Sequence, residues 1–90
     1  MDRIIIATHE ETGVSISDIL GNSIARDAVF ARRVAMLAGR EGSFSGLCMG
    51  SHFNMAPSNI SRIVSKARTD EKAVAASKRV LERAGIEPKE

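Results

Sequence analysis

Apolar residues along the chain recur mostly at helical spacing, and the most informative break in that spacing lies within residues 45–66. Five apolar positions there show an irregular spacing, namely Met49, Phe53, Met55, Ile60 and Ile63. The first two and the last two have helical spacing, but the period breaks between the pairs. The break holds Asn54, which tolerates the left-handed conformation that ends a helix, and Pro57, which suits the first position of a new one. Gly50 stands where two crossing helices must approach closely. This pattern predicts a helix-turn-helix, whose second helix lies in the major groove of DNA.

The second helix of this motif is expected from about Pro57 to Ala67. Its inner face consists of Ile60, Ile63 and Val64, and its outer face of Ser58, Asn59, Ser61, Arg62, Ser65 and Lys66. Small polar side chains, one asparagine and two cations can read base edges and hold phosphates. The alternative interpretation is an ordinary helical hairpin with a solvated polar face.

The remaining pattern predicts four further helices, over about residues 2–12, 16–20, 28–40 and 70–84. Gly13, Gly21, Gly42 and Gly85 are expected to end helices, and the expected N-caps are Ser15, Asp27, Thr69 and either Ser43 or Ser45. Phe30, Val34 and Leu37 form the expected buried stripe of the central helix, with Arg32, Arg33 and Arg40 on its other faces. Residues 22–26 form a loop.

Two expectations concern the ends of the chain. Ile4, Ile5 and Ile6 are consecutive, so they cannot all face one core, and at least one is expected at the domain edge. The tail, residues 87–90, is expected to be frayed. We therefore predict a single domain over residues 1–86.

Composition supports an all-α fold of five to six short helices. The 90 residues are 43% hydrophobic but only 3% aromatic, which suits close-packed helices better than a sheet. The single cysteine excludes an internal disulfide and fits a reducing compartment. We find no signal peptide and no apolar run of membrane-spanning length, so we expect a cytoplasmic protein without a membrane partner.

Charge is distributed unevenly along the chain. Residues 1–21 carry a net charge of −3, residues 22–68 carry +5, and residues 69–90 are balanced. The basic middle coincides with the predicted helix-turn-helix, which favours a polyanionic partner. His9, His52 and Cys48 are too few and too scattered for a metal or catalytic site, although Cys48 and His52 are spaced to share a helix face. We therefore expect no enzyme, no cofactor, no metal and no small-molecule substrate.

Three segments together resemble the C-terminal DNA-binding domain of the bacterial replication initiator DnaA. Residues 14–20 (VSISDIL) resemble its short second helix, residues 32–41 (RRVAMLAGRE) its long third helix, and residues 49–53 (MGSHF) the segment that enters its turn. The resemblance implies an all-helical, Trp-repressor-like domain, with the helix-turn-helix packed on a longer central helix, that binds double-stranded DNA.

The resemblance also implies site residues, with departures. The family's Asp-His-Thr-Thr signature is replaced here by Ala56, Pro57, Ser58 and Asn59, so the initiator's own binding box is not the expected target. The expected base contacts are Ser58, Asn59 and Arg62. Arg32, Arg33 and Arg40 match family positions that touch the DNA backbone, and Arg26 is the one arginine left in the preceding loop. With Ser61 and Lys66 they complete the expected backbone contacts, Arg26, Arg32, Arg33, Arg40, Ser61 and Lys66.

The function expected from these features is sequence-specific DNA binding in transcription regulation. No GxxxxGK[ST] phosphate-binding loop is present, so ATP-dependent initiation is not expected. Stand-alone relatives of this domain include regulators of phage-like gene transfer agents and of initiator activity. A nucleoid-associated regulator working with RNA polymerase or a co-regulator is the leading hypothesis. Two alternatives remain: a modulator of replication initiation at origin DNA, and a protein-interaction domain that has lost the DNA site.

Overall fold

The computed structural model describes residues 1–21 and 23–86, and this part of the chain contains six helices and no strand. The predicted all-α fold is thereby confirmed. The helices are α1 (Asp2–Thr12), α2 (Ile16–Leu20), α3 (Arg26–Glu41), α4 (Gly46–Phe53), α5 (Pro57–Ala67) and α6 (Glu71–Ala84). None of them is long and apolar enough to cross a lipid bilayer.

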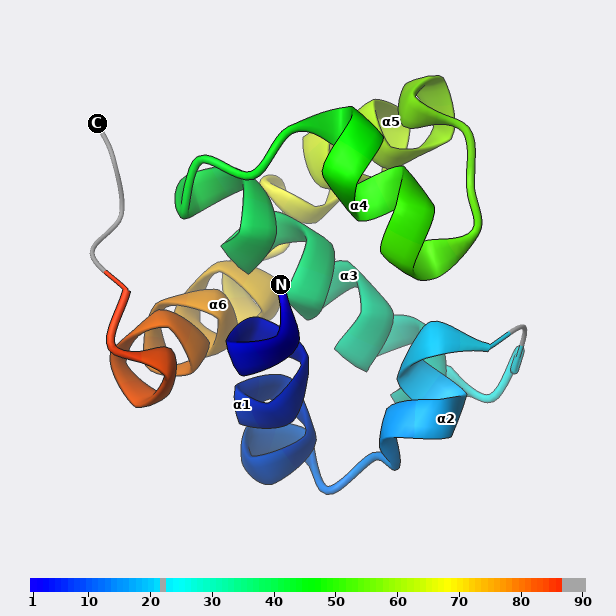
Figure 1. The fold of residues 1–90 in the computed structure, drawn as a ribbon. Helices are drawn as coiled ribbons and strands as arrows, with labels where there is room; N and C mark the ends of the chain where they lie inside the picture. Colours follow the sequence, from blue (N-terminus) through cyan, green and yellow to red (C-terminus); the bar gives the residue numbers. More distant parts are fainter. Residues whose placement is uncertain (22, 87–90) are drawn as a thin grey trace.

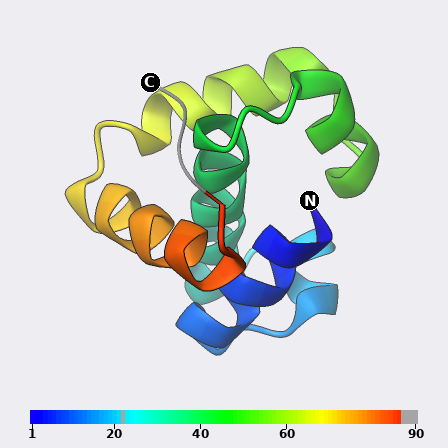
Figure 2. The ribbon, with the colours of Figure 1, turned by 60° about the vertical axis from the view of Figure 1, so that its left-hand side comes forward.

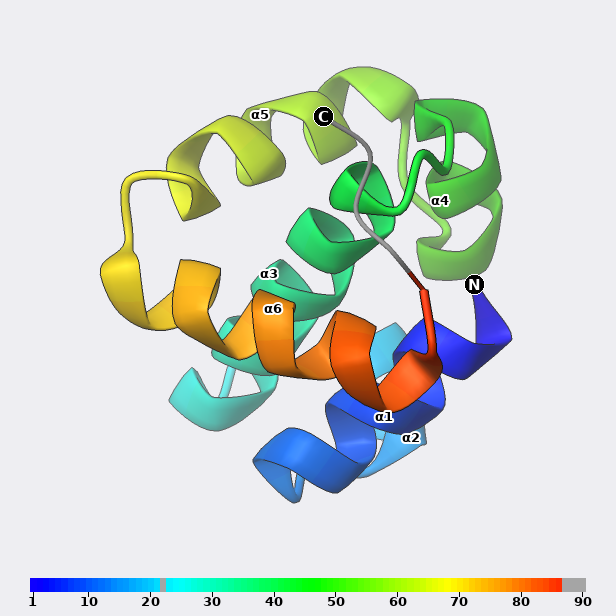
Figure 3. The ribbon, with the colours of Figure 1, turned by 90° about the vertical axis from the view of Figure 1, so that its left-hand side faces the viewer.

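The longest helix, α3, occupies the centre and packs against all five others. α4 and α5 lie on one side of it and α1 and α6 on the other (Figures 1 and 3). Figure 2 shows α5 running across the end of α3. The core is built from aliphatic and methionine side chains, the largest being Ile4, Ile19, Met36, Leu37, Met49, Ile60, Val34 and Val80. Alanines at positions 31, 35 and 38 of α3 are fully buried and allow this close packing.

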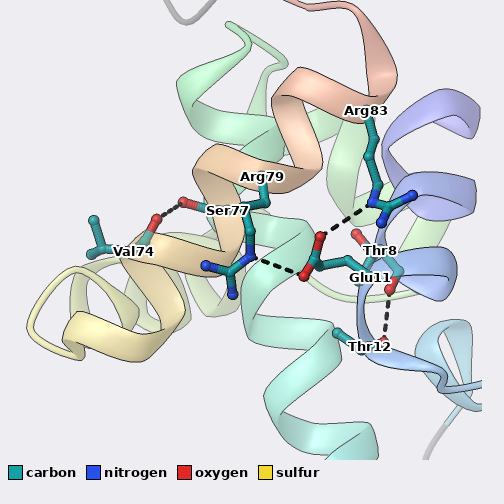
Figure 4. A network of polar contacts seen from close by, with 7 residues as sticks. All are labelled: Thr8, Glu11, Thr12, Val74, Ser77, Arg79 and Arg83. Atoms are coloured by element: carbon teal, nitrogen blue, oxygen red, sulfur yellow. Dashed lines mark hydrogen bonds and ion pairs between the residues drawn. The ribbon is translucent and has the colours of Figure 1, made fainter.

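The α1–α6 contact is held by both apolar and charged groups. Ile4 and Ile5 are buried, whereas Ile6 is half exposed, as expected of three consecutive isoleucines on one helix. Glu11 accepts hydrogen bonds from Arg79 Nε at 2.9 Å and Arg83 Nε at 3.2 Å (Figure 4). The two guanidinium groups lower the pKa of Glu11 from its ordinary value of 4.5, with the Arg79 hydrogen bond the largest cause.

Several helix boundaries agree with the sequence analysis. α1, α2 and α5 have the predicted bounds, and Gly13 and Gly85 end α1 and α6 in the left-handed conformation. Ser15 caps α2, and Ser45, rather than Ser43, caps α4. Asn22 and the tail 87–90 lie outside the described residues.

Three boundary expectations were wrong. α3 begins at Arg26, two residues early, because the Ala25 carbonyl accepts its first hydrogen bond, from the Val29 N–H at 2.9 Å. Asp27 therefore sits in the first turn, where an acidic group is favoured by the helix dipole. α6 is capped by Asp70, since Thr69 donates its hydroxyl to the last turn of α5 instead.

Candidate nucleic-acid interface

The α4–α5 pair, Gly46–Phe53 and Pro57–Ala67, is joined by a short turn. Ser45 Oγ accepts the Cys48 N–H at 3.0 Å and so starts α4. Asn54 ends it at φ 55° and ψ 48°, the left-handed conformation that the sequence predicted. Pro57 occupies the start of α5, where its missing N–H leaves no hydrogen bond unmade. The local chemistry of these residues therefore sets where each helix stops and starts.

Gly50 lets the turn fold back onto α4. Its carbonyl accepts the Met55 N–H at 3.0 Å, and a Cβ atom built on it would lie 2.5 Å from the Met55 carbonyl oxygen. No real side chain tolerates such a contact with backbone, so this position requires glycine. The sequence analysis placed the close approach between crossing helices. The structure places it instead against the turn itself and against Pro57.

α5 has two faces with opposite properties. Ile60 and Val64 are buried, together with Ala67, and Ile63 is half-buried. Every residue predicted for the outer face is exposed: Ser58, Asn59, Ser61, Arg62, Ser65 and Lys66. At 100° per residue these six positions span roughly 160° of the helix. An α-helix with its side chains is roughly 10–12 Å across, so α5 can enter the roughly 12 Å major groove of DNA with this polar face toward the bases.

Arg40 connects the last turn of α3 to the outer face of α5. Its Nη2 donates to Ser61 Oγ at 3.3 Å and lies 3.8 Å from a Cβ atom built on Gly46, the first residue of α4. Its Nε is buried and has no hydrogen-bond partner among the described residues. Gly46 is also close to Pro57, so the N-termini of α4 and α5 meet beside this guanidinium. Helix N-termini and a guanidinium all favour an anion at this junction.

Arg26, Arg33 and Arg40 recur every seven residues along α3, and we call them the arginine stripe. Seven residues are nearly two helical turns, so the three side chains leave α3 on one face, roughly 10 Å apart along its axis. Arg26 is exposed and the other two are half-buried. The seven-residue spacing was visible in the sequence. That all three arginines belong to one helix was not, because the predicted helix began at Ala28 and left Arg26 in the loop.

Arg32 does not have its predicted position. Its side chain is only 9% exposed, and its guanidinium donates to the carbonyls of Asp18, Ile19 and Ser23 at 2.8, 3.0 and 3.2 Å. One residue corresponds to 100° of helix, so Arg32 faces α2 while Arg33 faces away from it. The expectation that Arg32 holds a DNA phosphate is therefore corrected, because the side chain is buried and each of its three nitrogens already donates to a backbone carbonyl.

The helices α4 and α5 themselves carry no acidic residue, although Asp2 Oδ1 lies 3.6 Å from His52 Nε2 on α4 and Glu41 ends α3. No aspartate or glutamate occurs between Glu41 and Asp70 in the sequence. Within the described residues, none of the cations predicted to hold DNA forms an ion pair, namely Arg26, Arg33, Arg40, Arg62 and Lys66. By contrast, Arg79 and Arg83 pair with Glu11, and Arg68 pairs with Glu41 at 3.6 Å. An uncompensated positive surface is suited to phosphates.

Two further polar or sulfur-bearing side chains of α4 are His52 and Cys48. His52 is exposed, and its Nδ1 lies 3.0 Å from the carbonyl of the half-buried Cys48, so the two residues do share one helix face. Among residues 1–21 and 23–86, no cluster of three or more His, Cys, Asp or Glu side chains could hold a metal ion. Leu47 on α4, at 75% exposed, and Ile24 before α3, at 92%, were not singled out from the sequence. Both lie in irregular or terminal positions where apolar periodicity is uninformative.

Comparison of the sequence with protein-family models finds no matching family, and comparison with curated proteins finds no similar one.

Proposed function

We propose that this protein binds double-stranded DNA in a sequence-specific manner and regulates transcription. The observation that carries the proposal is the outer face of α5. It is an exposed ridge of small polar and cationic side chains on a helix pair that carries no acidic residue, and Arg40 beside it forms no ion pair within the described residues. The α4–α5 pair would then act as a helix-turn-helix, with α5 in the major groove.

The proposed contacts divide into two groups. Ser58, Asn59 and Arg62 lie in the first half of α5, the part of a recognition helix that reads base edges. Asparagine can bond adenine with two hydrogen bonds and arginine can do the same with guanine. The backbone contacts are assigned to Ser61, Lys66 and the arginine stripe, with Arg40 favoured by its place beside the N-termini of α4 and α5.

The resemblance to the DNA-binding domain of DnaA supports regulation as the biological role, by analogy. A single small domain buries limited DNA surface, so we propose a paired site or a protein partner such as RNA polymerase or a co-regulator. Nucleoid association follows from the same proposal. The exposed Leu47 lies at the start of α4, beside the proposed DNA surface, and is available to such a partner.

Selection from a random duplex pool tests the proposal. The purified protein is mixed with the pool, bound duplexes are recovered and sequenced, and affinity is measured by fluorescence anisotropy at several salt concentrations. Enrichment of one motif with a steep salt dependence is the expected result. Occupancy of origins rather than promoters in cells would favour the replication modulator. No binding at low salt would contradict DNA binding and favour the protein-interaction domain.

A further inference from the structure

Arg32 is a buried cation whose role the proposed function leaves open. Its three hydrogen bonds end on backbone carbonyls of α2 and of the segment before α3, and within residues 1–21 and 23–86 it forms no ion pair with a carboxylate. Carbonyls at a helix C-terminus lack intrahelical partners and carry partial negative charge. The carbonyls of Asp18 and Ile19 therefore compensate the buried guanidinium, and Arg32 fastens α2 to α3.

The third bond ends on the Ser23 carbonyl, just before α3 begins. Ser23 is separated from Arg26, the first residue of the arginine stripe, by only two residues, Ile24 and Ala25. Ala25 is the N-cap of α3 and supplies no side-chain hydrogen bond. First turns without an N-cap side chain fray readily, and here the one side-chain acceptor within the described residues is Asp27 Oδ1, which the Ala28 N–H reaches at 2.9 Å. The bond from Arg32 fixes the chain just before this turn.

We propose that Arg32 is a positioning residue for Arg26. It holds residues 23–25 against α3, keeps the first turn of α3 wound, and so places Arg26 on the DNA backbone without touching DNA itself. This inference rests on the proposed function, because Arg26 is one of its phosphate contacts. It assigns neighbouring arginines different roles: Arg33 contacts DNA directly, and Arg32 acts through Arg26.

Arg32→Lys is the decisive variant. Lysine keeps the positive charge but has one nitrogen, which cannot reach three carbonyls as the guanidinium fork does. Affinity for a selected duplex is measured by anisotropy over a salt series. Arg32→Lys is expected to lose about as much affinity as Arg26→Ala, roughly threefold to tenfold, with the salt slope falling by about 0.9 in both. Arg26→Ala with Arg32→Lys together should lose no more than Arg26→Ala alone.

Arg79→Lys is the matched control, since it weakens another structural guanidinium contact, to Glu11, on the far side of α3. It should leave DNA affinity unchanged. Ala25→Ser is the rescue, since serine supplies a side-chain acceptor at the N-cap, where alanine has none. Ala25→Ser should restore duplex affinity when combined with Arg32→Lys but not when combined with Arg26→Ala. If Arg32→Lys alone is too unstable to measure, the combined variant provides a more stable protein for the same measurement.

Two readouts decide the outcome. Hydrogen exchange at the amides of residues 28–30 should speed up in Arg32→Lys and slow again with Ala25→Ser. The positioning role would be overturned if Arg32→Lys bound the duplex as tightly as wild type. It would also be overturned if the affinity losses of Arg26→Ala and Arg32→Lys multiplied in the double variant. Either result would leave the proposal of DNA binding intact. Absence of duplex binding by the wild-type protein would instead overturn the proposed function and this inference with it.

Discussion

The guanidinium of Arg40 donates to Ser61 Oγ across the junction of α3 and α5, with 3.3 Å between Nη2 and Oγ. The contact joins the central helix to the exposed ridge of α5. A side chain of the scaffold therefore reaches the surface that we assign to DNA. The same guanidinium keeps a buried Nε without a partner among the described residues.

Arg40→Ala is therefore expected to weaken duplex binding more than Arg33→Ala, because it removes a phosphate contact and a support of α5 together. Losses of about tenfold for Arg40→Ala and about threefold for Arg33→Ala are expected from one or two charge-assisted contacts. Ser61→Ala removes the hydrogen bond from Arg40 and a neutral hydroxyl contact to the DNA backbone but no charge, so it should cost less than either. Anisotropy with one selected duplex measures all three. Equal losses for Arg40→Ala and Ser61→Ala would contradict the phosphate contact.

Asn59→Ala should change the sequence preference of DNA binding, whereas Arg33→Ala should change only the affinity. Asn59→Ala removes a base contact, so it should relax sequence preference at one or two positions and cost about 1–3 kcal/mol on the preferred site alone. Arg33→Ala removes a phosphate contact, so it should weaken all duplexes alike and lower the salt slope by about 1. The duplex selection and the salt series are repeated with both variants, and the preferred sequences and salt slopes are compared with those of wild type. Equal losses on every duplex for both variants would refute this division.

Gly50→Ala should destabilise the fold. The added methyl meets the Met55 carbonyl oxygen at 2.5 Å, so the turn must move. Overpacking against backbone costs about 1–3 kcal/mol, measured as the free energy of unfolding in urea. Gly46→Ala is the control, because its methyl meets Pro57 Cβ at an ordinary 3.4 Å. A stability loss in Gly46→Ala as large as in Gly50→Ala would show that the turn contact is not the cause.

Glu11→Gln should change how stability depends on pH. Arg79 and Arg83 lower the pKa of Glu11 below 4.5 in the folded protein, so the ion pairs stabilise the fold fully above that pH. The stabilisation is lost as the pH falls through the lowered pKa, when the carboxylate is protonated. Glu11→Gln should be less stable than wild type at pH 7, and the difference should shrink below pH 4.5. A difference that stays constant down to pH 3 would contradict the role of Glu11.

Much of the fold was predictable because local chemistry sets the helix ends. Asn54, Pro57 and Ser45 act within a few residues of themselves, and the bounds of α5 followed from them. The exposed face of α5 followed equally from its period. Gly50 was recognised as a close approach, but the atom it approaches was visible only in the structure.

The arginines of α3 show what sequence reasoning missed. Arg32 and Arg33 are identical neighbours, yet one is buried and the other is half-buried on the stripe. The hydrogen-bond partners of Arg32 are backbone carbonyls. Every residue has one, so a pattern of side chains cannot predict which carbonyls a buried arginine will bond. The early start of α3 was missed for the same reason, since Ala25 begins the helix through its carbonyl alone.

The most direct test of the proposed interface is to map where duplex DNA touches the protein. Amide chemical shifts of the isotope-labelled protein are followed by NMR while a selected duplex is added. We predict that the largest changes fall on residues 58–66 and on the arginine stripe, with α1 and α6 nearly unaffected. Shift changes centred on α1 and α6 would contradict the proposed interface. So would the absence of any shift change at about 100 µM duplex, a concentration at which even non-specific DNA-binding domains are bound.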